Sequence, residues 1–339
     1  MNDYLAIIKA GDALTEDQMK EAMTIIMDGK ASNDDMAEFL TGLAARGETA
    51  DEITGAARIL RERAIPLEAP YEALDCCGTG GDQKGTYNVS TAVALVAASC
   101  GVPMAKHGNR ASSSKSGAAD VLEVLGVNLD LSIEKLEEAL KTLHFAFLMA
   151  PNHHAAMTHV KEVRKEIGGR TIFNLLGPLI NPAGTRYQLM GVYDKALLPV
   201  MAEVLHRLGS KRAWVVHGSD GLDEITITGP TYAVTLDEDG QIEAKTITPE
   251  HFGLPVHDLE KLIGGSAEDN AAALRAVLEG QKCAYRDIVL ANTATVLHIH
   301  GSAETLKDGI DKAAESLDSG LAMQTLKDYI TFSREALSE

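Results

Sequence analysis

From Ala73 onward, short apolar runs alternate with longer segments of helical periodicity, and this alternation restricts the fold more than any other feature of the sequence. The runs ALDCC, VPMAKHG, FAFLMA, YQLMGVY and RAWVVHG are typical of buried strands. Strands that alternate with helices form largely parallel sheets covered by helices on both faces, and ligands bind at the carboxyl ends of those strands. We therefore predict an α/β domain over residues 71–339, with site residues in the loops that follow the strands.

The first 65 residues show only helical patterns. Thr15 and Gln18 form the T-x-x-Q signature of a helix N-terminus, and two further helices are expected at about 33–47 and 50–63. The segment that follows contains two prolines within five residues, which cannot continue a helix, so we place a linker there.

Four short helices alone bury little apolar area. We therefore predict a small all-helical domain over residues 1–65 that is joined by a helical piece near 160–185. Its outer face is expected to form a homodimer.

The chain has 31 Lys and Arg residues against 49 Asp and Glu residues, which gives a net charge of −18. A surface this acidic repels polyanions, so we expect no binding to nucleic acid or to anionic membranes. The cysteines lack the spacing of a metal or redox site, which indicates reduced thiols: Cys76, Cys77, Cys100 and Cys283. The sequence shows no signal peptide and no membrane span, and we expect a cytoplasmic protein.

One stretch reverses this acidity. No Asp or Glu occurs between Gln83 and Ala119, yet the stretch contains four basic residues: Lys84, Lys106, Arg110 and Lys115. A chance gap in the acidic residues is the alternative explanation. We predict instead that an anionic ligand binds here, because any anion that this acidic chain recognises needs a local excess of positive charge.

The first part of this stretch is preceded by a glycine-rich loop that leaves a strand and enters a helix with its N-cap near Ser90. Its glycines allow backbone N–H groups to point at an oxyanion, and the helix N-terminus adds partial positive charge. A diphosphate would fit. The loop is not a Rossmann fingerprint, which fails at Gln83, and it is not a Walker A loop, because Thr86 follows Gly85. A flexible turn without a ligand is equally compatible with the glycines alone.

A second polar loop, residues 106–117, also follows a strand and precedes a helix. Lys106 and Arg110 supply charge, while Asn109 and three serines supply neutral donors. Taken alone, this loop could be a solvated surface turn. Two loops after neighbouring strands can, however, close on one anionic ligand.

Asp223 and Glu224 come shortly after the strand Trp214–His217. Adjacent carboxylates at the end of a strand suit Mg²⁺, which takes one or two protein carboxylates and leaves its other positions to water and substrate phosphates. A solvated turn is the alternative. The pair would bridge to an anionic ligand through the metal, since bare carboxylates would repel that ligand.

Two further features give weaker signals. His153, His154 and His159 lack the H-E-x-x-H spacing, so we predict no zinc site. By periodicity alone, Arg164 is a surface residue of an amphipathic helix over residues 154–167.

Together, six segments in order resemble the anthranilate phosphoribosyltransferase family: GTGGD at 78–82, NVST at 88–91, KHGNR at 106–110, SSKSG at 113–117, RTIFNLLGPLINP at 170–182 and DE at 223–224. The resemblance spans essentially the whole chain. It implies a homodimer of the nucleoside phosphorylase class II fold. The implied reaction joins the phosphoribosyl group of 5-phosphoribosyl 1-diphosphate to the amine of anthranilate, with Mg²⁺, and releases diphosphate in tryptophan biosynthesis.

The resemblance also implies roles for individual residues. Phosphoribosyl diphosphate would contact Gly78, Gly81, Asp82, Thr86, Asn88, Val89, Ser90, Thr91, Lys106, His107, Gly108, Asn109, Arg110, Ala111, Ser112, Ser113, Ser114 and Ala118. Anthranilate would contact Gly78, Asn109, Arg164, His107 and His154. Two Mg²⁺ ions per monomer would be held by Ser90, Asp223 and Glu224. The chain departs from the family at three positions: Ala118 stands where Ser is common, His153 where an aromatic residue is common, and Ala155 where Pro is common.

The reaction needs no dedicated general base, because the aniline nitrogen of anthranilate is already neutral at pH 7. Its barrier lies mainly in separating an anionic leaving group from an oxocarbenium-like ribosyl cation, so we expect a site built for charge neutralisation and positioning. Two other functions stay open. A pyrimidine-nucleoside phosphorylase would not need the acidic pair, and a non-catalytic nucleic-acid-binding paralogue would need a basic stripe on its outer face.

Overall fold

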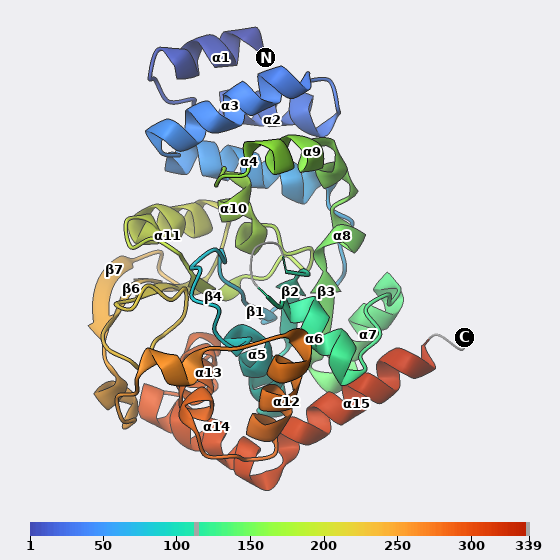
Figure 1. Cartoon of the computed structure of the whole chain (residues 1–339), viewed down its shortest axis with the longest axis vertical. Coiled ribbons are helices and arrows are strands. Elements are labelled where there is room, and N and C mark those ends of the chain that lie inside the picture. The colour runs from blue at the N-terminus through green and yellow to red at the C-terminus, as the bar shows by residue number, and fades with distance from the viewer. Residues whose placement is uncertain (112–114, 337–339) are drawn as a thin grey trace.

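The computed structural model describes residues 1–111 and 115–336. Four helices come first, followed by a seven-stranded sheet with helices around it (Figure 1). The predicted fold class, a small helical N-terminal part and a larger α/β part, is confirmed. Within the described ranges, no helix is long and apolar enough to cross a membrane.

Three of the four N-terminal helices begin after a residue whose side chain caps the helix: Thr15, Ser32 and Thr49. The four helices are α1 (Asn2–Lys9), α2 (Glu16–Met27), α3 (Asn33–Arg46) and α4 (Ala50–Arg63). Thr15 accepts a hydrogen bond from the Gln18 backbone N–H, and the Gln18 side chain accepts one from the Thr15 N–H. This reciprocal pair satisfies two donors that would otherwise be left unpaired at the start of α2.

The sheet has the strand order β3-β2-β1-β4-β5-β6-β7. Its strands are β1 (Leu74–Cys76), β2 (Met104–Gly108), β3 (Phe145–Met149), β4 (Tyr187–Gly191), β5 (Arg212–Gly218), β6 (Thr231–Leu236) and β7 (Ile242–Ile247). The first five strands pair in parallel, and β6 and β7 are antiparallel additions. Because β1 lies between β2 and β4, the loops that follow β1 and β2 emerge side by side.

The remaining α-helices are α5 (Val89–Ser99), α6 (Ala118–Leu125), α7 (Ile133–Leu143), α8 (Ala150–His153), α9 (Thr158–Ile167), α10 (Phe173–Leu176), α11 (Leu197–Arg207), α12 (Ala267–Leu278), α13 (Ala284–His300), α14 (Leu306–Ser319) and α15 (Leu321–Glu335). Four short 3₁₀ turns lie at Ala155–Met157, Gly177–Leu179, Pro249–Phe252 and Leu259–Leu262.

Two predicted helix starts were wrong. The helix expected over 154–167 begins at Thr158 instead, because the backbone of His154 leaves the helical region between α8 and a 3₁₀ turn. The N-cap of α5 is Asn88 and not Ser90, so Val89 and Ser90 already belong to its first turn.

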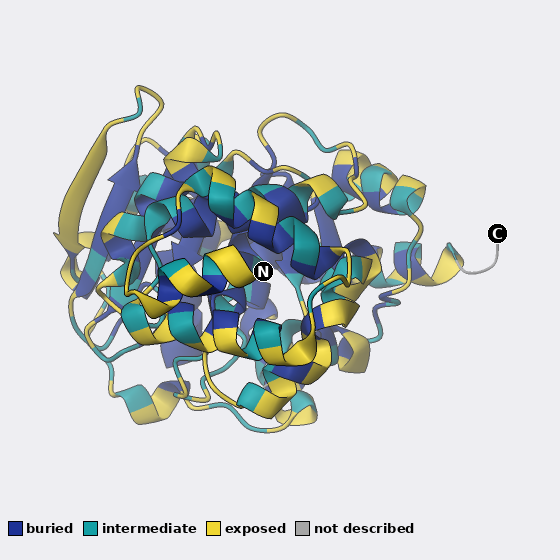
Figure 2. Ribbon diagram, turned by 90° about the horizontal axis from the view of Figure 1, so that it is seen from above, coloured by how far each residue is buried: buried dark blue, intermediate teal, exposed yellow. Residues whose placement is uncertain are grey.

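The sheet separates two hydrophobic clusters. Alternate residues of one strand point to opposite faces, so Trp214 of β5 lies in one cluster and Val215 in the other. The Trp214 cluster includes α5 and α13, whereas the Val215 cluster includes all four N-terminal helices together with α9, α10 and α11. In Figure 2 the strands lie mostly buried beneath these helices, and the edge strand β7 is largely exposed.

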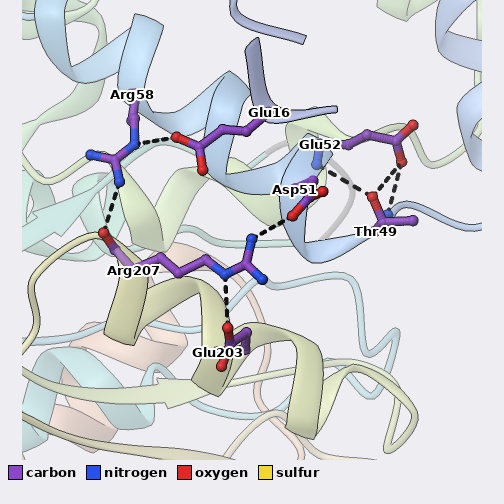
Figure 3. A network of polar contacts seen from close by, with 7 residues as sticks. All are labelled: Glu16, Thr49, Asp51, Glu52, Arg58, Glu203 and Arg207. Atoms are coloured by element: carbon purple, nitrogen blue, oxygen red, sulfur yellow. Dashed lines mark hydrogen bonds and ion pairs between the residues drawn. The ribbon is translucent and has the colours of Figure 1, made fainter. Parts of the chain in front are cut away.

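Arginines fix the N-terminal helices to α11 (Figure 3). Arg58 of α4 donates to the carbonyl of Arg207 at 2.9 Å and to Glu16 at 2.7 Å. The Arg207 side chain in turn binds Glu203 at 2.7 Å and Asp51 of α4. Since α11 packs directly on the sheet, these contacts place the four helices relative to the strands.

Candidate functional site

A cleft of about 360 Å³ lies at the carboxyl ends of the strands. Four segments supply most of its lining: the glycine loop (residues 78–85), the start of α5, the end of β2 with the residues after it, and the acidic turn (residues 220–224). The two predicted loops and the predicted acidic pair therefore face one space. Of the second loop predicted at residues 106–117, Lys106, His107 and Gly108 belong to β2, so from this point the second loop means residues 109–117.

Most of the predicted site residues line this cleft: Gly78, Gly81, Asp82, Thr86, Asn88, Val89, Ser90, Lys106, His107, Gly108, Asn109, Ala118, Asp223 and Glu224. Others lie outside its lining: Thr91, Arg110, Ala111, His154 and Arg164. Ser112, Ser113 and Ser114 fall outside the residues that the structure describes. Several other lining residues were not predicted as site residues: Cys77, Tyr87, Ser116, Ala150 and Gly177.

The glycine loop is held by partners that are far away in the sequence. The Thr79 N–H donates to the Gly191 carbonyl at 2.9 Å, and the Gly80 N–H donates to the Asp223 carboxylate at 2.8 Å. The guanidinium of Arg170 donates to the Gly81 carbonyl. At Gly78 a side chain has no room, because its Cβ would lie 2.4 Å from an Asp223 oxygen. The loop therefore packs closely against the acidic turn.

Three carboxyl groups meet where the glycine loop touches the acidic turn. Burial and the neighbouring Asp82 charge raise the pKa of Asp223 to about 7. Burial and then the Asp223 charge raise the pKa of Glu224 well above its usual range, and burial also raises that of Asp82. The backbone N–H of Ser90 opposes the rise at Glu224. A cation placed here would relieve both the burial of these negative charges and their mutual repulsion.

The donor set fits a magnesium ion that binds together with a ligand. No group of three or more His, Cys, Asp or Glu side chains within residues 1–111 and 115–336 is arranged to hold a metal. Mg²⁺ is usually bound by only one or two protein carboxylates, with water and phosphate oxygens completing the octahedron. Asp223 and Glu224 both line the cleft and supply such oxygens.

The start of α5 presents its first N–H groups without a side-chain cap. Asn88 is instead fixed from outside the loop, since it accepts a hydrogen bond from Asn270 at 2.9 Å and its carbonyl accepts one from the Tyr285 hydroxyl at 3.0 Å. Neither Asn270 nor Tyr285 carries a local sequence signal for this contact. The first turn of α5 is thus a positioned donor group for an anion.

Lys106 brings a buried positive charge to the cleft. Its side chain is 1 % exposed, and its ammonium donates to the His107 carbonyl at 2.9 Å. Burial alone would lower the pKa of this ammonium, but the carboxylate of Asp75 reverses the sign and the pKa is raised. Lys106 therefore stays charged at neutral pH. Asp75 itself accepts hydrogen bonds from the His107 N–H and the Asn181 amide.

Two histidines form a neutral wall beside the cleft. Burial lowers the pKa of His107 to about 3 and that of His154 to about 4. Their rings meet edge to face with centroids 5.4 Å apart, and Nδ1 of His107 lies 3.1 Å from the Gly177 carbonyl. Uncharged imidazoles are suitable neighbours for an aromatic ring.

Arg164 is half-buried, not the fully exposed helix residue that periodicity alone indicates. Its guanidinium lies 5.3 Å from the centre of the Phe173 ring, and burial lowers its pKa. Among the described residues, the Arg164 guanidinium has no hydrogen-bond or ion-pair partner. A half-buried guanidinium of this kind can bind a carboxylate.

Arg110 points elsewhere. Its guanidinium binds the Glu123 carboxylate at 2.7 Å and the Asp120 carboxylate at 3.2 Å, both on α6. Asp120 also accepts hydrogen bonds at 2.9 Å from the N–H groups of Ala111 and Gly117. The described part of the second loop is thus held by the first turns of the helix that follows it.

Comparisons with known proteins cover both parts of the chain. Residues 2–64 match the helical bundle domain of a glycosyl transferase family, and residues 70–323 match its a/b domain. The chain is 53% identical over 338 residues to the anthranilate phosphoribosyltransferase of Azospirillum brasilense, and the aligned region covers 100% of this chain and 94% of that protein. It is 52% identical over 322 residues to the Rhodospirillum rubrum protein of the same name, covering 95% of this chain and 92% of that protein.

Solved structures are similar over nearly the whole chain. The anthranilate phosphoribosyltransferase of Thermus thermophilus superposes with a TM-score of 0.92 at 44% identity, covering 98% of this chain and 99% of the other. The Saccharomyces cerevisiae protein in complex with PRPP and Mg gives 0.90 at 30% identity, covering 98% and 97%. The same yeast protein with 4-fluoroanthranilate gives 0.88 at 28% identity, covering 98% of each chain.

Proposed function

Because this chain belongs to the anthranilate phosphoribosyltransferase family, we propose that its cleft binds phosphoribosyl diphosphate between the glycine loop, the start of α5 and the acidic turn. The chain transfers the phosphoribosyl group of this substrate to the amine of anthranilate, which gives N-(5-phosphoribosyl)anthranilate and diphosphate. The observation that supports the proposed site best is that one cleft joins the buried ammonium of Lys106 and the start of α5 to the half-buried pair Asp223 and Glu224.

The diphosphate is assigned to the glycine loop and α5. Backbone N–H groups of residues 78–91 supply donors without the flexibility of side chains, and the N-terminus of α5 adds partial positive charge. Lys106 supplies a full charge that Asp75 keeps protonated. We assign the remainder of the phosphoribosyl group to residues 106–114 and to Ala118, whose missing hydroxyl leaves only its backbone for contact.

Mg²⁺ would be held by Asp223, Glu224 and Ser90, with two ions per monomer as our proposal. Yeast relatives with Mg bound support the use of this metal. When bound, the metal neutralises the charge that develops on the departing diphosphate. The raised pKa of Asp223 and Glu224 fits this role, since each carboxylate is costly to ionise until a cation arrives.

Anthranilate is assigned to the side of the cleft near α9. Arg164 offers a planar two-pronged donor to the substrate carboxylate, which an ammonium cannot match. Asn109 and Gly78 would contact the substrate from the loops, and the neutral rings of His107 and His154 would line its entry.

The protein acts mainly by positioning and by charge neutralisation. The bond between C1′ and the diphosphate oxygen breaks as the neutral amine of anthranilate attacks C1′, and the amine proton passes to solvent afterwards. We assign no general base. Helix and loop N–H groups, with Lys106, face the oxygens on which negative charge develops, and such prearranged donors are usually the largest contribution to catalysis.

Three broader assignments also belong to this proposal. We assign residues 1–65, with the helical piece near 160–185, to one domain and residues 71–339 to the catalytic domain. The shared cluster of Ile53, Val160 and Leu176 supports joining the helical piece to the N-terminal helices. We propose a homodimer formed by the outer face of the helical domain, and a cytoplasmic location. Sedimentation at micromolar concentration tests the dimer, and a monomer would contradict it.

The activity is tested by incubating the protein with phosphoribosyl diphosphate, Mg²⁺ and anthranilate while anthranilate fluorescence is followed. We expect fluorescence to fall and diphosphate to appear in equal amount. Leaving out the metal is the control and should stop the reaction. Unchanged fluorescence with protein that circular dichroism shows to be folded would overturn the proposal.

A further inference from the structure

Arg170 touches the glycine loop although it lies almost ninety residues further along the chain. It follows α9, and its guanidinium donates to the Gly81 carbonyl. The same guanidinium lies 3.9 Å from the centre of the Tyr193 ring, a stacked cation–π contact. Arg170 does not line the cleft, whereas Gly81 and Asp82 do. It therefore contacts the loop away from the proposed ligand.

Tyr193 also contacts the glycine loop directly, through its backbone. Its backbone N–H donates to the Thr79 hydroxyl at 3.1 Å, next to the bond from Thr79 N–H to the Gly191 carbonyl. The segment after β4 thus fixes Thr79 directly and fixes Gly81 through Arg170. Gly80, whose N–H is bound to Asp223, lies between these two fixed points.

The bond to the Gly81 carbonyl matters because this part of the loop has little conformational preference of its own. Gly80 and Gly81 have positive φ angles of +64° and +79°, and glycine reaches many other backbone states at similar energy. In a trans peptide the carbonyl and the following N–H point in opposite directions. By holding the Gly81 carbonyl, Arg170 keeps the Asp82 N–H directed away from the Arg170 guanidinium.

We propose that Arg170 is a positioning residue of the reaction: it holds the glycine loop in the conformation that presents backbone N–H groups to the diphosphate of the substrate. The inference rests on the proposed function of the cleft and adds a residue that does not touch the substrate. It predicts an effect on binding of the diphosphate part of the substrate, with the anthranilate site left nearly unchanged.

The test compares Arg170→Gln and Arg170→Lys with the unmodified protein. Arg170→Gln should raise KM for phosphoribosyl diphosphate by about fivefold to tenfold and weaken magnesium diphosphate binding by a similar factor, as measured by calorimetry. KM for anthranilate at saturating phosphoribosyl diphosphate should change by less than about twofold. Arg170→Lys keeps the charge but lacks the planar group that stacks and donates together, so it should not restore binding.

Two further variants separate this role from general damage. Tyr193→Leu removes the stacked ring without touching the loop contacts of the backbone, and it should reproduce part of the Arg170→Gln effect. Arg186→Gln is the matched control, because Arg186 also stacks on a tyrosine, Tyr71, with 4.9 Å to the ring centre, but lies at the opposite end of β4. It should leave both KM values unchanged.

Several outcomes would overturn the inference. These are an unchanged KM for phosphoribosyl diphosphate in Arg170→Gln, full recovery in Arg170→Lys, which would mean that only charge matters, or equal increases for both substrates. Failure of the proposed function looks different: the unmodified protein itself would then bind no magnesium diphosphate. Amide hydrogen exchange of residues 79–84 without ligand gives an independent readout, and it should be faster in Arg170→Gln than in the unmodified protein.

Discussion

The glycine loop and the second loop follow neighbouring strands and both precede helices, yet they are held in different ways. The glycine loop is fixed by Gly191, Asp223 and Arg170, which belong to other parts of the fold. The described part of the second loop is fixed by Asp120 and Glu123 in the helix that comes directly after it.

This difference separates a donor group that is already arranged from one that must change partners. The N–H groups of Thr79, Gly80 and Lys84 are already bound within the protein and hold the glycine loop in place. The other N–H groups of the loop can be presented without rearrangement, and such preorganisation lowers the cost of binding. Arg110 in the second loop is already paired with two carboxylates, so any movement of its guanidinium away from α6 toward a phosphate would weaken these pairs. We expect the glycine loop to contribute more to affinity than Arg110 does.

The strongest test removes the acidic partners of the glycine loop. Asp223→Asn together with Glu224→Gln should lower activity by about a thousandfold and abolish the dependence of phosphoribosyl diphosphate binding on Mg²⁺, because neutral amides are poor ligands for this ion. Steady-state kinetics and calorimetry with and without metal measure the two effects.

The matched control for that variant is Asp237→Asn with Glu238→Gln, another adjacent Asp-Glu pair that follows a strand but is exposed. It should change neither quantity. Undiminished activity in the Asp223 and Glu224 variant would show that the acidic turn is only a solvated turn.

A second test asks whether α9, which lies outside both loops, holds anthranilate through Arg164. Arg164→Ala should raise KM for anthranilate by a factor that corresponds to about 2–5 kcal/mol, the usual cost of removing one partner of a buried charge pair. KM for phosphoribosyl diphosphate should move little. Lys161→Ala, at an exposed position of the same helix, is the control. Equal effects on both substrates would exclude Arg164 as the carboxylate clamp.

A third test uses pH to probe the contact between the glycine loop and the acidic turn. The pKa of Asp223 is raised to about 7, so below this pH the carboxyl holds a proton that a metal must displace. The affinity for magnesium diphosphate should therefore rise with pH up to about 7, by at most about tenfold per pH unit, and then level off apart from the titration of diphosphate itself.

Asp223→Asn removes the titration of Asp223 and leaves the titrations of diphosphate, Glu224 and Asp82 in place. Calorimetry near pH 6.5 in buffers of different ionisation enthalpy should detect about one fewer proton released by the variant. The same proton release from both proteins would exclude Asp223 as the titrating group.

The smallest expected effect lies in the second loop. Glu123→Gln weakens the hold on Arg110 at an exposed site, so KM for phosphoribosyl diphosphate should fall, by no more than about twofold to threefold. Glu138→Gln, which breaks a similar exposed pair with Lys135, should have no effect. A rise in KM for Glu123→Gln would mean that the paired form of Arg110 is the form that binds.

The contrast between local and long-range contacts also explains which features the sequence could predict. The first five strands, the helical N-terminal part and the cap at Thr15 follow from local patterns, and the structure has them. Strands β6 and β7 were not predicted. The glycine loop and the pair Asp223 and Glu224 were also recognisable, because their residue types suit an anion and its metal. Their juxtaposition in one cleft followed from the expectation that ligands bind at strand ends.

What the sequence did not predict depends on long-range contacts. Arg170 was noted only as part of a segment, and nothing near it indicates that its guanidinium reaches Gly81. Asn270 and Tyr285, which hold Asn88, lie in helices from the last quarter of the chain. The helix break at His154 was missed because the apolar periodicity of residues 154–167 continues through a backbone angle that no local residue type requires.

The arginine contacts between α4 and α11 bear on how such a chain could be divided during evolution. Arg58 and Arg61 bind the carbonyls of Arg207 and Leu208, which no following turn of α11 can satisfy. The N-terminal helices thus complete the end of a helix that lies well over a hundred residues downstream. A recombination event that moved residues 1–63 alone would leave these carbonyls without their arginine partners and one face of the sheet less covered. We therefore expect the two parts to be inherited as one unit, although their sequences read as separate modules.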